Sequence, residues 1–201
     1  MDIAKTVEAL TKRGFIAKQF ETAAEALNDV VPQIESGQSV GVGGSVTVRD
    51  MGLTQALRDK GVRVNWHWEP EEDGADASRD RASCSDVYLT SSNALTETGI
   101  LVNIDGMGNR VCAMTYGVPK VFVLVGRNKI CPDVESAIYR VKNVASPLNA
   151  QRLNYNTPCA KTGKCNDCNS PDRICKITVI HEGAPTRTEM HVYIINEDLG
   201  Y

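Results

Sequence analysis

Stretches of helical periodicity alternate along the chain with short apolar runs, and this alternation predicts an α/β fold. Helical periodicity marks four segments, at residues 3–13, 22–36, 49–60 and 134–144. In the first of them, Ile3, Val7 and Leu10 lie on one helix face. Thr22 and Glu25 have the spacing of a capping box, which indicates where the second segment begins as a helix.

The apolar runs are rich in β-branched residues and are bounded by turn-forming residues, which is typical of strands. They lie at residues 15–20, 39–42, 62–66, 87–89, 100–104, 121–125, 177–180 and 191–195. The runs at 87–89, 100–104 and 121–125 are mostly apolar and rich in β-branched residues, so we expect them to be buried central strands. Residues 69–81 are acidic and then mixed, which predicts a solvated excursion from the sheet, with a loop at 69–76. The expected fold is a Rossmann-like, mostly parallel sheet flanked by helices, in one domain spanning residues 1–201.

The composition excludes several classes of partner. The formal net charge is −3 and the basic residues are dispersed, so nothing favours binding to nucleic acid. No apolar run approaches the roughly 20 residues that a membrane-spanning helix needs. Residues 1–14 are charged and amphipathic, without the apolar core of a secretory signal. We therefore expect a cytoplasmic protein without a membrane span.

Four of the seven cysteines lie close together near the C-terminus, in a polar loop at residues 157–176. They are Cys159, Cys165, Cys168 and Cys175, with the spacing C-x5-C-x2-C-x6-C. Four thiolates at such a spacing predict a metal centre on the surface of the sheet region. The single C-x2-C pair favours an iron–sulfur cluster, with 4Fe–4S expected first, whereas zinc ribbons usually contain two such pairs. Zinc and disulfides remain alternatives, although an odd cysteine count in a reducing compartment argues against disulfides.

A glycine-rich turn at residues 41–47 leads from an expected strand into an expected helix. Free backbone N–H groups at such a turn favour an anion, and hydroxyl side chains add further donors. The candidate anion-binding residues are Gly43, Gly44, Ser45 and Thr47. The turn matches neither a Walker loop nor the full dinucleotide fingerprint. The alternative is a tight turn in which glycine only satisfies the backbone.

Polar residues also gather at both ends of the run at 100–104. Asn93 and Glu97 precede this run, while Asn109 and Arg110 follow it. Glu97 is a candidate catalytic base or nucleophile, and Arg110 is suited to hold a carboxylate or phosphate. We assign Asn93 and Asn109 to ligand binding at the same cleft. The alternative is that Glu97 and Arg110 pair with each other or cap helices.

Several motifs together resemble the LUD domain, the lactate-utilisation protein family. They are G-x-G-G-S-x-T at 41–47, T-E-T-G-x-L-V at 96–102, G-x-G-N-R at 106–110 and the strand PKVFVLVGRNKI at 119–130. The resemblance covers most of residues 1–150. It implies a fold similar to ribose-5-phosphate isomerase and the CoA transferases, with a ligand cleft at the carboxyl ends of the strands. Glu97-Thr98-Gly99 is loosely similar to the acyl-accepting Glu of CoA transferases.

The resemblance implies a protein that takes part in the oxidation or metabolism of lactate or another small hydroxy acid, together with a redox partner protein. The expected ligand is a small anionic metabolite, a carboxylate or a phosphate. One alternative is a non-redox isomerase or acyl/CoA transferase acting through Glu97, with a structural zinc. Another is a metabolite-sensing regulatory subunit. The sequence leaves open whether the chain is an enzyme and whether it forms a homo-oligomer.

Overall fold

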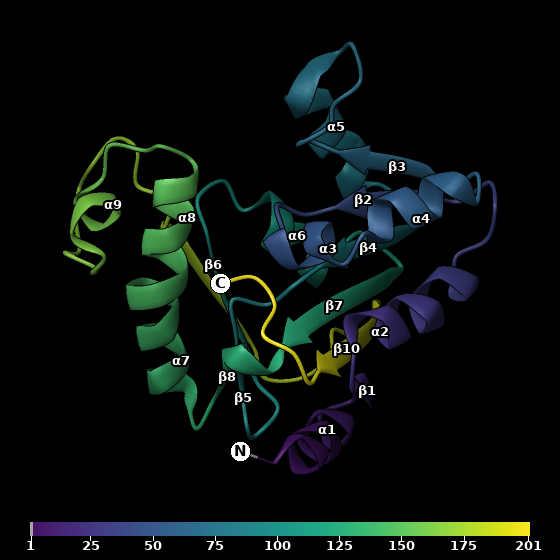
Figure 1. Ribbon diagram of the computed structural model, residues 1–201, viewed down its shortest axis with the longest axis horizontal. Coiled ribbons are helices and arrows are strands. Elements are labelled where there is room, and N and C mark those ends of the chain that lie inside the picture. The colour runs from purple at the N-terminus through teal and green to yellow at the C-terminus, as the bar shows by residue number, and fades with distance from the viewer. Residues whose placement is uncertain (1) are drawn as a thin grey trace.

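Six parallel strands form the larger of two sheets in the computed structural model, which describes residues 2–201 (Figure 1). Their order across the sheet is β1-β10-β7-β4-β2-β3. The strands are β1 (Ile16–Phe20), β2 (Ser39–Val42), β3 (Arg63–Trp66), β4 (Val87–Thr90), β7 (Lys120–Gly126) and β10 (Glu189–Ile195). All neighbouring pairs are parallel, so the carboxyl ends of the strands meet at one edge.

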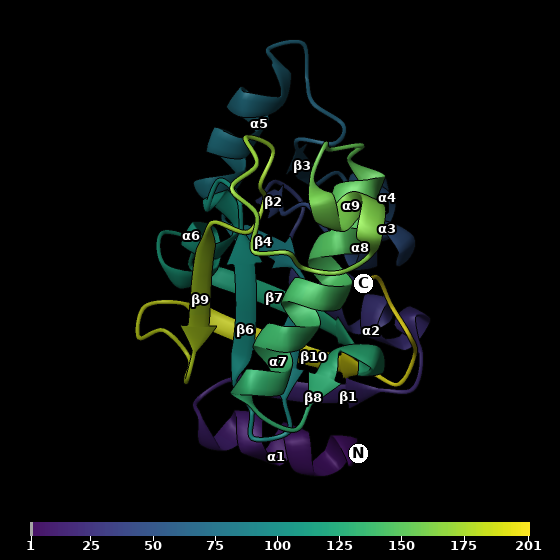
Figure 2. The same ribbon diagram turned by 90° about the vertical axis from the view of Figure 1, so that its left-hand side faces the viewer.

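Four strands form the second sheet, in the order β8-β5-β6-β9. They are β5 (Ala94–Thr96), β6 (Leu101–Asp105), β8 (Ile130–Cys131) and β9 (Ile177–His181). The strand β6 pairs antiparallel with both β5 and β9, whereas β5 and β8 are parallel. Figure 2 shows β6 and β9 side by side, with the green helices α7 and α8 next to them.

Helices cover both sheets. They are α1 (Ile3–Lys12), α2 (Ala23–Val30), α3 (Val46–Asp50), α4 (Leu53–Asp59), α5 (Gly74–Ser83), α6 (Asn109–Thr115), α7 (Val134–Arg140), α8 (Ser146–Arg152) and α9 (Pro158–Thr162). Short 3-10 helices occupy Val31–Gln33 and Arg127–Lys129, and a π-helical turn at Val141–Ala145 joins α7 to α8. No helix in residues 2–201 is long and apolar enough to cross a membrane.

Strand β7 explains why the larger sheet needs helices on both faces. Its residues are buried on both faces, and successive side chains point to opposite sides of the sheet. Phe122 and Leu124 pack in one core with Leu53 and Leu57 of α4. The alternate positions of β7 join a second core with Leu10 of α1 and Met114 of α6. Burial of both faces is the pattern expected of a parallel sheet flanked by helices, and this part of the predicted fold class is confirmed.

Two local predictions were wrong. The run at 100–104 forms most of β6, which lies in the second sheet and not in the centre of the parallel one. A short apolar run shows that a strand is buried but not which strand is its partner. Residues 69–81 contain most of α5, where small residues such as Ser78 and Ala82 make the buried contacts. A side chain at Gly41 would lie 2.2 Å from the carbonyl oxygen of Ala82, so α5 packs against β2 through small residues.

Candidate functional site at the carboxyl edge of the parallel sheet

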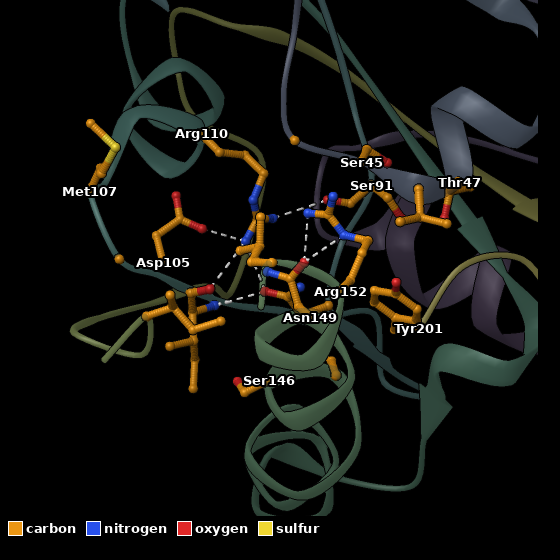
Figure 3. Close-up of a pocket in the computed structure, with 18 of the residues that line it drawn as sticks. Ser45, Thr47, Ser91, Asp105, Met107, Arg110, Ser146, Asn149, Arg152 and Tyr201 are labelled. Atoms are coloured by element: carbon orange, nitrogen blue, oxygen red, sulfur yellow. Dashed lines mark hydrogen bonds and ion pairs between the residues drawn. The ribbon is translucent and has the colours of Figure 1, made fainter. Parts of the chain in front are cut away.

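A pocket of about 350 Å³ opens where four strands of the parallel sheet end (Figure 3). The loops after β2, β3, β4 and β7 contribute Gly44, Ser45, Thr47, His67, Trp68, Ser91, Ser92, Asn93 and Lys129. The opposite wall comes from α8 and from the end of β6, through Asp105, Ser146, Asn149, Arg152 and Leu153. The sheet edge and α8 therefore enclose the pocket between them.

A buried network holds Arg110 at the base of the pocket. Its Nη2 donates to Asp105 Oδ1 at 2.5 Å and to Asn93 Oδ1 at 2.8 Å. Its Nη1 donates to Asn103 Oδ1 and to the carbonyl of Ser91. Arg110 and Asp105 are both about nine-tenths buried, and the second oxygen of Asp105 accepts the backbone N–H of Val111. The network fixes the guanidinium through charge-assisted hydrogen bonds, so little freedom remains to be lost when a ligand binds.

Lys129 is the second cation of the pocket and ends the 3-10 helix that follows β7. It is only 4% exposed. Its Nζ donates to Thr47 Oγ1 and to Ser91 Oγ, each at 2.9 Å. Within residues 2–201, no carboxylate pairs with this lysine. Burial, together with the nearby charges of Arg140 and Arg110, lowers its pKa from the ordinary 10.5 to about 7.

The rim of the pocket carries Arg152 of α8. Its guanidinium lies 4.4 Å from the centre of a Trp68 ring, a cation–π contact. Arg152 Nε and Nη2 donate to Asn149 Oδ1 at 3.1 and 2.9 Å, and dashed lines mark these bonds in Figure 3. Beside them, burial and the charges of Arg79 and Arg152 lower the pKa of His67 from 6.5 to about 4. His67 is therefore neutral near pH 7.

The charges around the pocket do not balance. The lining residues include four basic side chains, Arg79, Arg110, Lys129 and Arg152, and one carboxylate, that of Asp105. Asp105 is already bound to Arg110, and Arg79 pairs with Asp76 outside the lining. Within residues 2–201, Lys129 and Arg152 are therefore left without a carboxylate side-chain partner. A concave, partly desolvated site with excess positive charge favours an anion, because Coulomb interactions are stronger where water is excluded.

Most of the predicted anion-binding residues lie together in this pocket. Gly44, Ser45, Thr47, Asn93, Asn109 and Arg110 all line it. Gly43 lies just behind the wall, where a side chain would approach Thr90 Oγ1 at 3.1 Å and Arg110 Cδ at 3.3 Å. Ser45 begins α3, and its hydroxyl accepts the N–H of Val48. The glycine-rich turn thus leads into a helix, as the sequence predicts.

Glu97 lies away from the other predicted site residues. Glu97 is exposed in the turn that follows the C-terminal end of β5. Asn93 precedes the other end of β5 and lines the pocket, whereas Glu97 does not line it. The neighbouring Gly99 packs against the backbone of α1. Arg110 pairs with Asp105 instead of with Glu97. The structure therefore does not bring the two predicted catalytic residues together, and a catalytic role for Glu97 stays a prediction.

Sequence reasoning missed Lys129 and Arg152 as site residues. Lys129 had a signal, since it lies three residues beyond the end of a buried parallel strand, near the edge where ligands bind. Arg152 had no such signal in the sequence, because only the packing of α8 across the pocket brings it near Trp68. Trp68 lines the pocket beside His67.

The four clustered cysteines are not gathered around a common point. All four are half-buried and free. Within residues 2–201, no three side chains of His, Cys, Asp or Glu are close enough to bind a metal ion. The C-x2-C turn is nevertheless folded, with Asp167 at φ 41° and its N–H donating to Cys165 Sγ at 3.4 Å.

The cysteine segment adjoins the pocket wall. Ile174, next to Cys175, lines the pocket and lies against Gly106. The N–H of Lys176 donates to the carbonyl of Asp105 at 2.9 Å. A change in the cysteine loop can therefore reach the pocket through Ile174 and through the backbone of Asp105.

The fold and the pocket define an α/β protein with a cationic ligand site at the carboxyl edge of a parallel sheet. The chain belongs to the LUD-domain family, whose model matches residues 3–195. It is also similar in structure to a DUF162 family protein from Deinococcus radiodurans, with a TM-score of 0.52, 13% identity and 96% of each chain covered. At that identity the likeness concerns the fold alone. No curated protein matches the sequence.

Proposed function

We propose that this LUD-domain protein binds a small anionic metabolite, a carboxylate or a phosphate, in the pocket at the sheet edge. The observation that carries the proposal is the unbalanced charge of the pocket. Lys129, from the 3-10 helix after β7, and Arg152, from α8, reach it without a carboxylate partner among its lining residues. The hydroxyls of Ser45, Thr47 and Ser91 add neutral polar groups around these cations.

The volume and the lining favour a small hydroxy or oxo acid, such as lactate or its oxidation product. About 350 Å³ is at the lower end of the range for small-molecule sites. Mixed hydroxyl and cationic groups can bind a carboxylate and a neighbouring oxygen at the same time. We therefore place the protein in the metabolism of lactate or a related hydroxy acid, the role that its family resemblance implies.

We also propose that Cys159, Cys165, Cys168 and Cys175 bind an iron–sulfur cluster, with 4Fe–4S first and zinc as the alternative. Supporting observations are the four thiols on one short segment, the folded C-x2-C turn and the lack of regular structure at 163–176. Cys159 lies in α9, whereas Cys165, Cys168 and Cys175 lie in this irregular part and can move toward it without disrupting a helix or strand. When bound, a cluster would carry single electrons between the pocket ligand and a redox partner protein.

Anion binding is tested by isothermal titration of the protein with lactate, pyruvate and inorganic phosphate. The expected result is saturable binding of at least one of them. Arg152→Ala should weaken that binding about 10- to 150-fold, since a hydrogen bond to a charged group contributes about 1.5–3 kcal/mol. Arg127→Ala is the matched control, because Arg127 is an exposed arginine paired with Asp198 outside the pocket. No binding of any of the three anions, or equal weakening in both variants, would contradict the proposal.

The metal proposal is tested by purifying the protein without oxygen and measuring iron, sulfide and zinc. Stoichiometric iron and sulfide that disappear in Cys168→Ser would support a cluster. Cys112→Ser is the control, because Cys112 is an exposed thiol outside the loop. Stoichiometric zinc without iron would leave a structural centre and remove the redox role. Protein lacking both metals under these conditions would refute the metal site.

A further inference from the structure

Lys129 differs from the other cations of the pocket in having only hydroxyl partners. Its ammonium or amine group lies between Thr47 of the glycine-rich turn and Ser91 of the loop after β4. Arg110 is bound by Asp105, and Arg152 lies exposed on the rim. A lysine that serves only as a structural cation would be expected to have a carboxylate partner at such burial.

The hydrogen-bond geometry accommodates the neutral amine. Thr47 Oγ1 lies 3.2 Å from the carbonyl oxygen of Leu199, and Ser91 Oγ lies 3.3 Å from that of Ser92. A carbonyl can only accept, so each hydroxyl donates its proton there and must accept from Lys129. A neutral amine has two N–H groups, and these two acceptors use both of them. The nitrogen lone pair then remains free for a ligand in the pocket.

The charges that face Lys129 favour the same form. Arg110 from α6 and Arg140 from α7 act on it, and both disfavour a third positive charge. Thr47 and Ser91, the groups that contact its nitrogen directly, are uncharged. Together with burial, these charges bring the pKa of Lys129 to about 7. A substantial fraction of the lysine is therefore unprotonated and nucleophilic at neutral pH.

We propose that Lys129 is a nucleophile that forms an imine with the carbonyl carbon of a small oxo acid bound in the pocket. The inference rests on the proposed anion site, which would hold the carboxylate of the same molecule. The nitrogen lone pair attacks the carbonyl carbon, the amine nitrogen loses its two protons to the carbonyl oxygen, which leaves as water, and a carbon–nitrogen double bond forms. The step is reversible and involves no oxidation or reduction. The uncharged hydroxyls of Thr47 and Ser91 hold the nitrogen in place during the attack.

The test uses the full chain with pyruvate as the probe and borohydride as the trapping reagent. Borohydride reduces an imine to a stable secondary amine, which peptide mass spectrometry locates. The expected result is one pyruvate-dependent adduct on the peptide that contains Lys129. Lys129→Arg keeps a cation but cannot form the imine, and it should lose the adduct. Lys164→Arg changes an exposed lysine outside the pocket and should retain the adduct.

The outcomes separate this inference from the proposed function. Pyruvate that binds by titration without an adduct at Lys129 would overturn the inference and leave the anion site intact. Adducts spread over exposed lysines, with none favoured at Lys129, would also overturn it. Absence of both binding and adduct would refute both proposals. Mapping the wild-type chain localises the adduct directly, so the test does not depend on the folding of the Lys129→Arg variant.

Discussion

The pocket and the cysteine loop are neighbours that are built in opposite ways. In the pocket, polar groups are fixed at the ends of buried strands, and Arg110 makes at least four hydrogen bonds before any ligand is present. In the cysteine loop, residues 163–176 form no helix or strand. Its main ties are hydrogen bonds from Arg173 to the carbonyls of Cys168 and Cys175. The fold assembles the first site, whereas the second depends on the metal that we propose.

This difference predicts that substitutions in the pocket cost folding energy, while substitutions in the metal-free loop cost little. The largest effect is expected from Arg110→Met, which leaves Asp105 buried without its partner. Breaking a buried ion pair costs about 3–5 kcal/mol. Urea unfolding measures this loss, and Arg127→Met, at an exposed pair, should cost no more than about 1 kcal/mol. Equal losses in the two variants would show that the network does not stabilise the pocket.

A smaller loss is expected from Gly43→Ala. The added carbon would lie 3.1 Å from Thr90 Oγ1 and 3.3 Å from Arg110 Cδ, so the pocket base must shift. Overpacking of this kind costs about 1–3 kcal/mol. Gly44→Ala is the neighbouring control, because its nearest contact would be an ordinary 3.5 Å. The comparison fails if urea unfolding gives the two variants the same stability.

The pH dependence of stability tests the environment of Lys129. Its pKa of about 7 in the folded protein lies below the ordinary 10.5 of an unfolded chain. The buried charge therefore destabilises the folded state below pH 7, and this penalty is lost as the pH rises from 7 toward 10.5. The unfolding free energy of the wild type relative to Lys129→Met should rise by at most about 1.4 kcal/mol per pH unit in this window. A flat difference would mean an unperturbed lysine.

The smallest stability effect is expected in the loop. Cys168→Ser in metal-free protein should change the unfolding free energy by no more than about 0.5 kcal/mol, as at other sites without packed partners. The same substitution should lower the stability of metal-loaded protein, because metal bound to the native state adds to stability. Thermal unfolding with and without bound metal measures both values. A large loss in the metal-free protein would mean that the loop is already a packed part of the fold.

The sequence predicts the parallel sheet and much of the pocket because both follow from local patterns. β7 is continuously apolar, and the turn at Gly43 and Ser45 directly follows a strand. The partner of β6 could not be predicted, because pairing depends on contacts between distant segments. The same is true of Arg152, which the packing of α8 brings to the rim. Glu97 was predicted as a site residue but lies outside the pocket. A motif beside a strand does not show at which end of the sheet its residues lie.

The central claim is that the cationic pocket at the sheet edge is the ligand site. It is tested most directly by following the backbone amide NMR signals during a titration with pyruvate. Because these residues line the pocket, we expect the signals of Gly44 to Thr47, Ser91 to Asn93 and Lys129 to shift. Signals that do not shift at these positions, or shifts that centre on Glu97 at the far turn, would contradict it.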